Sequence, residues 1–205
     1  MIPPLFYGLV AMLGVLSMGF QLLASRLLSP HFGSSIIVWA WLISTFLAAF
    51  SAGSLLGGWI SRLPAPPRGR AQLAAAAVGL AALALTAVGG AGLLDRIELA
   101  VADINLGLCV SCLTLFFVPV AALSCFGPQA VQYLAGRGTP PGSASGLVYG
   151  ISTLGNIAGV MLTAFAFIPH LRVSLLLYLW LAAGAASLAG LLAILRSAPA
   201  AATPP

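Results

Sequence analysis

Charged residues are scarce in this chain: only 5% of its 205 residues are Asp, Glu, Lys or Arg. Lysine is absent, and three acidic residues stand against eight arginines. A chain that is 61% hydrophobic with so little charge cannot be kept soluble in water. The shortage also excludes a groove for nucleic acid, a catalytic domain outside the membrane and an acidic tail. We therefore expect an integral membrane protein with the lipid bilayer as its surroundings.

The few charges divide the chain into six uncharged stretches, each longer than the roughly 20 residues that a transmembrane helix needs. The stretches cover residues 1–25, 27–61, 71–94, 104–136, 138–171 and 173–195. This pattern predicts an all-α fold, a polytopic bundle of six transmembrane helices over residues 1–196. Residues 197–205 are rich in alanine and proline, which predicts a disordered tail.

The arginines predict the orientation of this bundle. Cytoplasmic loops carry an excess of basic residues, and the turn between the second and third spans holds three arginines. Six crossings then assign Arg62, Arg68, Arg70, Arg137 and Arg196 to the cytoplasm, and Arg26, Arg96 and Arg172 to the outside. Both termini are expected in the cytoplasm. Heavy use of alanine, glycine and arginine without lysine is typical of GC-rich bacterial genomes, so we expect the bacterial inner membrane.

Small residues four positions apart let transmembrane helices approach closely. The second, fifth and sixth spans contain such pairs, and the third is a thin, alanine-rich helix. We expect a close-packing face on every helix but the first and the fourth. The predicted packing residues are Gly53, Gly57, Ser54, Gly58, Gly155, Gly159, Ala182, Ala186 and Gly190.

Prolines and glycines predict where helices end or bend. Pro30 and Gly33 are expected to break the helix after the first span, and three prolines make Ser61 to Arg70 a tight connection. Pro119 falls inside the fourth span, where its missing N–H leaves the Leu115 carbonyl free and should bend the helix.

All three acidic residues fall in one predicted outer loop: Asp95, Glu98 and Asp103. Apolar residues recur there at helical spacing on the opposite side: Leu94, Ile97, Val101 and Ile104. The pattern fits a short helix lying on the membrane surface or an ordinary solvated loop equally well.

Polar residues inside the spans either bond to neighbouring helices or line a polar path. These candidates are Gln21, Arg26, Ser152, Thr153, Asn156 and Thr163. No span carries a charged residue at its middle, which argues against a proton-coupled pump and against a catalytic acid and base pair. An Ile-Ser-Thr triplet at 43–45 and again at 151–153, in spans of opposite direction, favours a three-plus-three inverted repeat.

Cysteine and histidine offer little for a cofactor. Cys109 and Cys112 form a C-x-x-C inside a charge-free helix with no histidine nearby, so we expect apolar filling, with a redox role as the alternative. His31 and His170 are predicted at the outer ends of spans, and two histidines without a carboxylate do not specify a metal. No nucleotide-binding glycine loop is present, so we expect no cofactor, no metal and no enzymatic activity.

Two segments carry a family resemblance: Leu23 to Ser35 with Trp39, and Gly146 to Gly159 continuing through Thr163 to Pro169. They resemble the membrane domain of bacterial fused major-facilitator/spermidine-synthase proteins. The resemblance implies a bundle similar to half of a major-facilitator transporter, usually followed by a soluble aminopropyltransferase-like domain. The glycine loop and paired aspartates of that domain are missing here, so polyamine synthesis does not carry over.

These observations favour a non-enzymatic inner-membrane subunit that acts as an accessory or scaffold module. Its partner would be a second copy or another membrane protein, in keeping with many contact surfaces and little chemistry. The first alternative is a transporter-like half-bundle that moves a neutral or amphiphilic solute as a dimer. The second is an intramembrane redox protein that uses Cys109 and Cys112.

Overall fold

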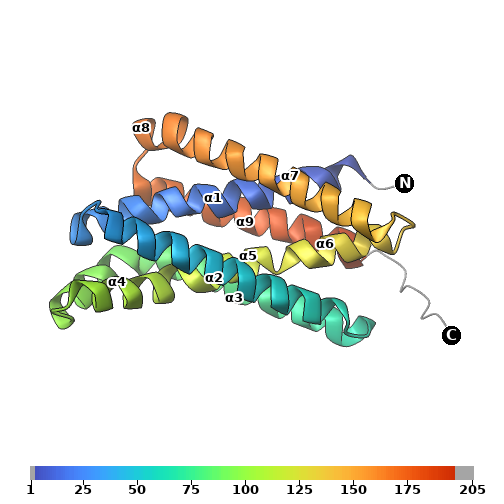
Figure 1. The fold of residues 1–205 in the computed structure, drawn as a ribbon, viewed down its shortest axis with the longest axis horizontal. Coiled ribbons are helices and arrows are strands. Elements are labelled where there is room, and N and C mark those ends of the chain that lie inside the picture. Colours follow the sequence, from blue (N-terminus) through green and yellow to red (C-terminus); the bar gives the residue numbers. More distant parts are fainter. Residues whose placement is uncertain (1–2, 197–205) are drawn as a thin grey trace.

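A computed structural model describes residues 3–196 as six long helices, in which each runs opposite to the one before (Figure 1). The six are 24 to 36 residues long, and each is apolar enough to cross a bilayer. The described part of the chain contains no strand, so the prediction of an all-α polytopic bundle is confirmed. The predicted disordered tail, 197–205, lies outside the described residues.

Four spans are single helices, and two are interrupted by π-helical turns. The single helices are α1 (Pro4–Phe32), α2 (Ile36–Ser61), α3 (Ala65–Ala100) and α9 (Val173–Arg196). The fourth span consists of α4 (Ile104–Cys112), η1 (Leu113–Phe117), α5 (Val118–Ser124) and α6 (Phe126–Ala135). The fifth span consists of α7 (Pro141–Met161), η2 (Leu162–Phe167) and α8 (Ile168–His170).

The first two connections between helices are shorter than expected, because the end turns of a helix tolerate proline. Pro30 lies inside α1, and the helix breaks at Gly33, whose φ of 72° suits glycine. Pro66 and Pro67 form the first turn of α3, where an unpaired N–H is no loss. The predicted connection from Ser61 to Arg70 therefore shrinks to residues 62–64.

The segment that contains Asp95 and Glu98 is neither the surface helix nor the solvated loop that the sequence allowed. Asp95 and Glu98 lie on the last turns of α3, which continues to Ala100 without a separate surface helix or loop. Nothing between Leu94 and Ala100 breaks a helix, and Leu94 and Ile97 are buried against the bundle. Burial of this apolar face extends the helix past the predicted end of the third span.

Each π-helical turn is followed by a proline: η1 comes before Pro119, and η2 before Pro169. Pro119 has no N–H to donate to the Leu115 carbonyl, which instead accepts a hydrogen bond of 2.7 Å from Thr86 Oγ1 of α3. A neighbouring helix thus satisfies the carbonyl that the sequence analysis expected to be free.

The first and fourth spans form the centre of the packing, contrary to expectation. A Cβ atom on Gly53 or Gly57 would overlap the backbone carbonyl of Ala121 or Cys125 in the fourth span. On the other side, a Cβ on Gly155 or Gly159 would overlap the carbonyl of Ala11 or Val15 in α1. The first and fourth spans supply the backbone against which these glycine pairs pack.

Of the other predicted packing residues, Gly190 packs within this chain, whereas Gly58, Ala182 and Ala186 do not. Ala182 and Ala186 are exposed, whereas Gly184 and Ser187 form the buried side of α9. A Cβ on Gly190 would lie 3.1 Å from Leu9, but one on Gly58 would meet no atom within 4 Å. An alanine stripe does not by itself distinguish a helix-facing side from a lipid-facing side.

The helix contacts have the symmetry expected of a three-plus-three inverted repeat. α2 packs on the fourth span, as α7 packs on α1. α3 packs on the fourth span, as α9 packs on α1. In each half, the second and third spans therefore pack on the first span of the other half, although the two halves run in opposite directions. The glycine pairs are 102 residues apart and the Ile-Ser-Thr triplets 108, so the triplets are not equivalent positions of this repeat.

Candidate functional site

A cavity of about 260 Å³ lies between α2 and α7, with α1 and the α5–α6 segment as its floor. Its apolar wall includes Phe50, Phe126 and Tyr149. No charged residue lines the cavity. Its polar lining consists of six side chains: Ser17, Ser54, Ser124, Ser152, Thr153 and Asn156. The cavity reaches the bundle surface at Thr153, which is exposed. Its lining is therefore polar without being ionic.

Three of the six side chains form hydrogen bonds to carbonyl groups of their own helix. Ser17 Oγ donates to the Leu13 carbonyl at 2.8 Å, and Thr153 Oγ1 to the Tyr149 carbonyl at 2.7 Å. Ser124 Oγ lies 3.1 Å from the Ala121 carbonyl in its own helix. Such bonds satisfy a hydroxyl inside a transmembrane helix without a partner helix.

The side chains of the other three, Ser54, Ser152 and Asn156, make no hydrogen bond within residues 3–196. Ser54 comes from α2, and Ser152 and Asn156 stand four apart on one face of α7. The unused hydrogen-bonding groups therefore come from the two helices that border the cavity. Asn156 offers two amide donors and one acceptor carbonyl, whereas each serine hydroxyl offers one donor.

Gly14 of α1 allows Asn156 to take this position. A Cβ on Gly14 would lie 3.0 Å from the Asn156 backbone nitrogen and 3.1 Å from its Oδ1. Any larger residue at position 14 would also overlap the Ser152 carbonyl. The absence of a side chain thus lets α7 rest directly on α1, with Asn156 lining the cavity.

The other predicted path residues lie elsewhere. Arg26 borders a second pocket of about 340 Å³ near the Trp39 end of the bundle. Thr163 is fully buried in η2 and its Oγ1 has no hydrogen-bond partner in the described chain. Gln21 is half-buried on α1 and lines neither pocket. Only Ser152, Thr153 and Asn156 of the predicted set come together.

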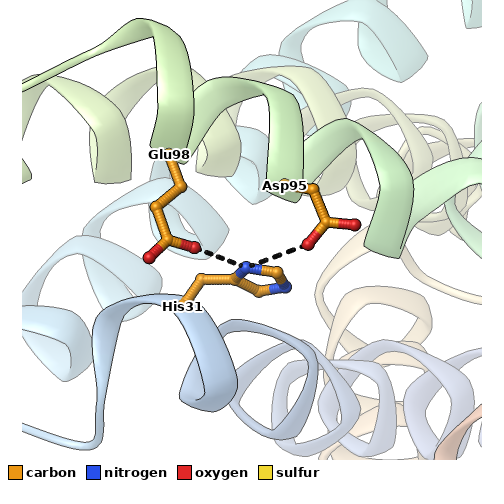
Figure 2. Close-up of polar contacts among 3 residues, drawn as sticks. All are labelled: His31, Asp95 and Glu98. Carbon is orange, nitrogen blue, oxygen red and sulfur yellow. Dashed lines mark hydrogen bonds and ion pairs between the residues drawn. The ribbon is translucent and has the colours of Figure 1, made fainter.

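A polar cluster that the sequence analysis missed joins the ends of α1 and α3 (Figure 2). His31 Nδ1 lies 2.9 Å from Glu98 Oε2 and 3.7 Å from Asp95 Oδ1. The two carboxylates are three residues apart and therefore share one face of α3. The spacing of the two carboxylates is visible in the sequence, but only the fold shows that His31 lies beside them.

The two histidines do not share a site, although the first and fifth spans that carry them are neighbours. His170 Nδ1 lies 2.8 Å from the Ala166 carbonyl of its own span. Within residues 3–196, no group of three or more His, Cys, Asp or Glu side chains is arranged to hold a metal ion. Cys109, Cys112 and Cys125 are free thiols, and the last two are buried.

Buried glutamines form a second polar contact that sequence reasoning missed. Gln72 Nε2 of α3 donates to Gln129 Oε1 of α6 at 2.8 Å, and Gln129 Nε2 donates to the Cys125 carbonyl at 3.0 Å. Both side chains are nearly fully buried. A glutamine in an apolar stretch is the signal here, because a buried amide must find a partner.

No protein-family model matches the chain, and no curated protein or solved structure is similar enough to count as a match. The site must therefore be interpreted from its own geometry. That geometry offers an uncharged cavity with three unpartnered polar groups, inside a multipass membrane bundle.

Proposed function

We propose that this protein is a non-enzymatic subunit of the bacterial inner membrane that acts by association. The interacting face is the one between α2 and α7, and the partner is a second copy or another membrane protein. The observation that carries the proposal is the group of Ser54, Ser152 and Asn156, which have no hydrogen-bond partner in the described chain. Asn156 lies near the middle of a 30-residue span, where water is scarce.

Polar groups without partners are unfavourable in hydrocarbon, where each costs on the order of a few kcal/mol. A partner helix seated on the α2–α7 face would supply hydrogen bonds and remove these groups from lipid. The adjoining outer side of α7 is also open: Gly146 and Gly150 are exposed, and a Cβ on either would meet no atom within 4 Å. Glycines of this kind permit close helix approach.

Charge supports an orientation with both termini in the cytoplasm. The end of the bundle where the described chain starts and stops holds five arginines and no acid: Arg62, Arg68, Arg70, Arg137 and Arg196. The opposite end holds three arginines and all three acids. The positive-inside rule assigns the first end to the cytoplasm.

The symmetric contacts between the two halves support the inverted repeat that the resemblance to the membrane domain of fused major-facilitator/spermidine-synthase proteins implies. On this proposal a partner membrane protein could carry the soluble domain that such proteins contain.

The test is the oligomeric state of the full chain in lipid nanodiscs and mild detergent, measured by light scattering and by what copurifies from its native membrane. A Thr153→Phe variant should lose the complex, because Thr153 is exposed and lines the cavity of the proposed interface. Thr114→Phe is the matched control, since Thr114 of η1 is also exposed and, like Thr153, donates to a carbonyl of its own span. A wild-type chain that is monomeric and alone in both media would contradict the proposal.

The cavity itself favours a second candidate, transport of a neutral or amphiphilic solute by a dimer. Its lining offers hydroxyl and amide groups without charge. The distinguishing experiment is uptake into liposomes that contain the wild type or Asn156→Leu. Loss of uptake with the complex intact would favour transport, whereas no uptake by the wild type would leave association as the function.

A further inference from the structure

The cytoplasm-assigned end of the bundle contains a pocket of about 350 Å³ where the start of α3 meets the end of α9. Three arginines line it: Arg68, Arg70 and Arg196. The acidic residues of the chain, Asp95, Glu98 and Asp103, all belong to the opposite end of the bundle. The three guanidinium groups therefore share one hollow without a carboxylate side chain to neutralise them.

One of the three arginines is fixed by the backbone of the other helix. Arg196 Nη2 donates to the Gly69 carbonyl at 3.0 Å. The guanidinium lies close to the Cα of Gly69, because a Cβ there would be 3.5 Å from the same nitrogen, an ordinary van der Waals contact. Arg68 and Arg70 make no side-chain hydrogen bond or ion pair within residues 3–196. Each guanidinium offers five N–H donors, so most of their donors are unused.

The backbone groups and dipoles at the ends of α3 and α9 would not by themselves attract an anion to this pocket. Pro66 and Pro67 remove two of the N–H groups that the start of α3 would otherwise present. The positive end of the α3 dipole also meets the negative end of the α9 dipole, so the two fields oppose each other. The attraction for an anion must come from the arginine side chains, whose planar forks suit phosphate oxygens.

We propose that this pocket binds the phosphate headgroup of an anionic phospholipid. A lipid is favoured over a soluble phosphate because the apolar surface of a span begins directly beside the pocket. Leu73, three residues beyond Arg70 on α3, is 46% exposed, and Leu195 lines the pocket. The arginines thus lie at headgroup level, with exposed leucine below them for acyl chains. The site is independent of the α2–α7 face and of the proposed association.

The experiment measures binding of the full chain, purified in detergent, to lipids by native mass spectrometry and by thermal stability. The probes are phosphatidylglycerol, phosphatidylcholine and inorganic phosphate. We expect phosphatidylglycerol to be retained and to raise the melting temperature, and the other two to do neither. Arg68→Gln with Arg70→Gln should weaken phosphatidylglycerol binding roughly thirty-fold, which corresponds to about 1 kcal/mol for each arginine.

Two controls separate charge from fold. Arg68→Lys with Arg70→Lys keeps the charge and should retain most of the binding, which also shows that substitution here is tolerated. Arg172→Gln removes an arginine at the opposite end of the bundle and should leave binding unchanged. Equal binding of phosphatidylcholine, or equal loss in Arg172→Gln, would overturn the proposal. A response to inorganic phosphate as strong as the response to lipid would overturn the assignment to a lipid.

Discussion

The two halves of the bundle, α1 to α3 and the fourth to sixth spans, hold each other through matching contacts. The second helix of each half places a glycine pair on the backbone of the first helix of the other half. The third helix of each half donates a hydrogen bond to that same partner helix: Thr86 Oγ1 to the Leu115 carbonyl, and Trp180 Nε1 to the Leu16 carbonyl. Four contacts of two kinds thus connect the halves.

The halves differ in how well their second helices are covered. Nine of the 26 residues of α2 are buried, against four of the 21 residues of α7. π-helical turns before a proline occur in the fourth and fifth spans, and none in α1, α2 or α3. The same framework therefore covers more of α2 than of α7. The fifth span is the least covered of the six and carries Ser152 and Asn156.

Gly155→Leu should have the largest effect, because it breaks the main attachment of α7. The leucine would overlap the Ala11 carbonyl, so α7 must move away from α1. Overpacking of this kind costs about 1–3 kcal/mol, and we expect about 3 kcal/mol because backbone, not a side chain, must yield. Unfolding by SDS titration in mixed micelles measures the loss. Gly92→Leu, at an open position on α3, should change stability little.

Gly57→Leu tests the corresponding contact of the other half and should have a smaller effect. The leucine would overlap the Cys125 carbonyl, but α2 remains held by Val38, Leu42 and Phe46 toward its other end. We expect a loss of about 2 kcal/mol in the same titration. Gly58→Leu is the adjacent control, with no atom within 4 Å of its Cβ. A larger loss for Gly57→Leu than for Gly155→Leu would contradict the difference between the halves.

These contacts show how far sequence reasoning reaches. Gaps between charged residues predicted all six spans, because a crossing helix tolerates no charge at its middle. The glycine spacing identified the pairs at 53 and 57 and at 155 and 159, but not their partners. The carbonyls of Ala11, Val15, Ala121 and Cys125 that meet these glycines have no signature in the sequence, so the partners of the glycine pairs were not predictable.

The candidate site was predictable only in part, for a similar reason. Asn156 is recognisable as an amide in an apolar span, but its neighbour Ser54 lies 102 residues away. Which serines are unused depends on local hydrogen bonds, such as that of Ser17 to Leu13, which spacing does not reveal. The cluster of His31 with Asp95 and Glu98 likewise requires that two helix ends meet.

Thr86→Val tests the hydrogen bonds between the halves and should cost less than either leucine variant. The substitution removes the donor to the Leu115 carbonyl at nearly constant volume. Hydrogen bonds between membrane helices contribute about 0.6 kcal/mol on average and at most about 1.7. We expect about 1 kcal/mol, because Pro119 has no N–H for that carbonyl. Thr114→Val is the control, since Thr114 donates only within its own span.

Glu98→Gln should have the smallest effect, because the cluster at His31 joins α1 to α3 inside one half and has no counterpart in the other (Figure 2). The side chains of Glu98 and Asp95 are 51% and 66% exposed, so water and salt weaken their attraction to His31. The amide keeps the length of the side chain and can still bond to the imidazole. We expect a loss of at most about 0.5 kcal/mol in the same SDS titration. A loss as large as that of Gly57→Leu would mean that contacts within a half, and not the matched contacts between halves, determine the stability of the bundle.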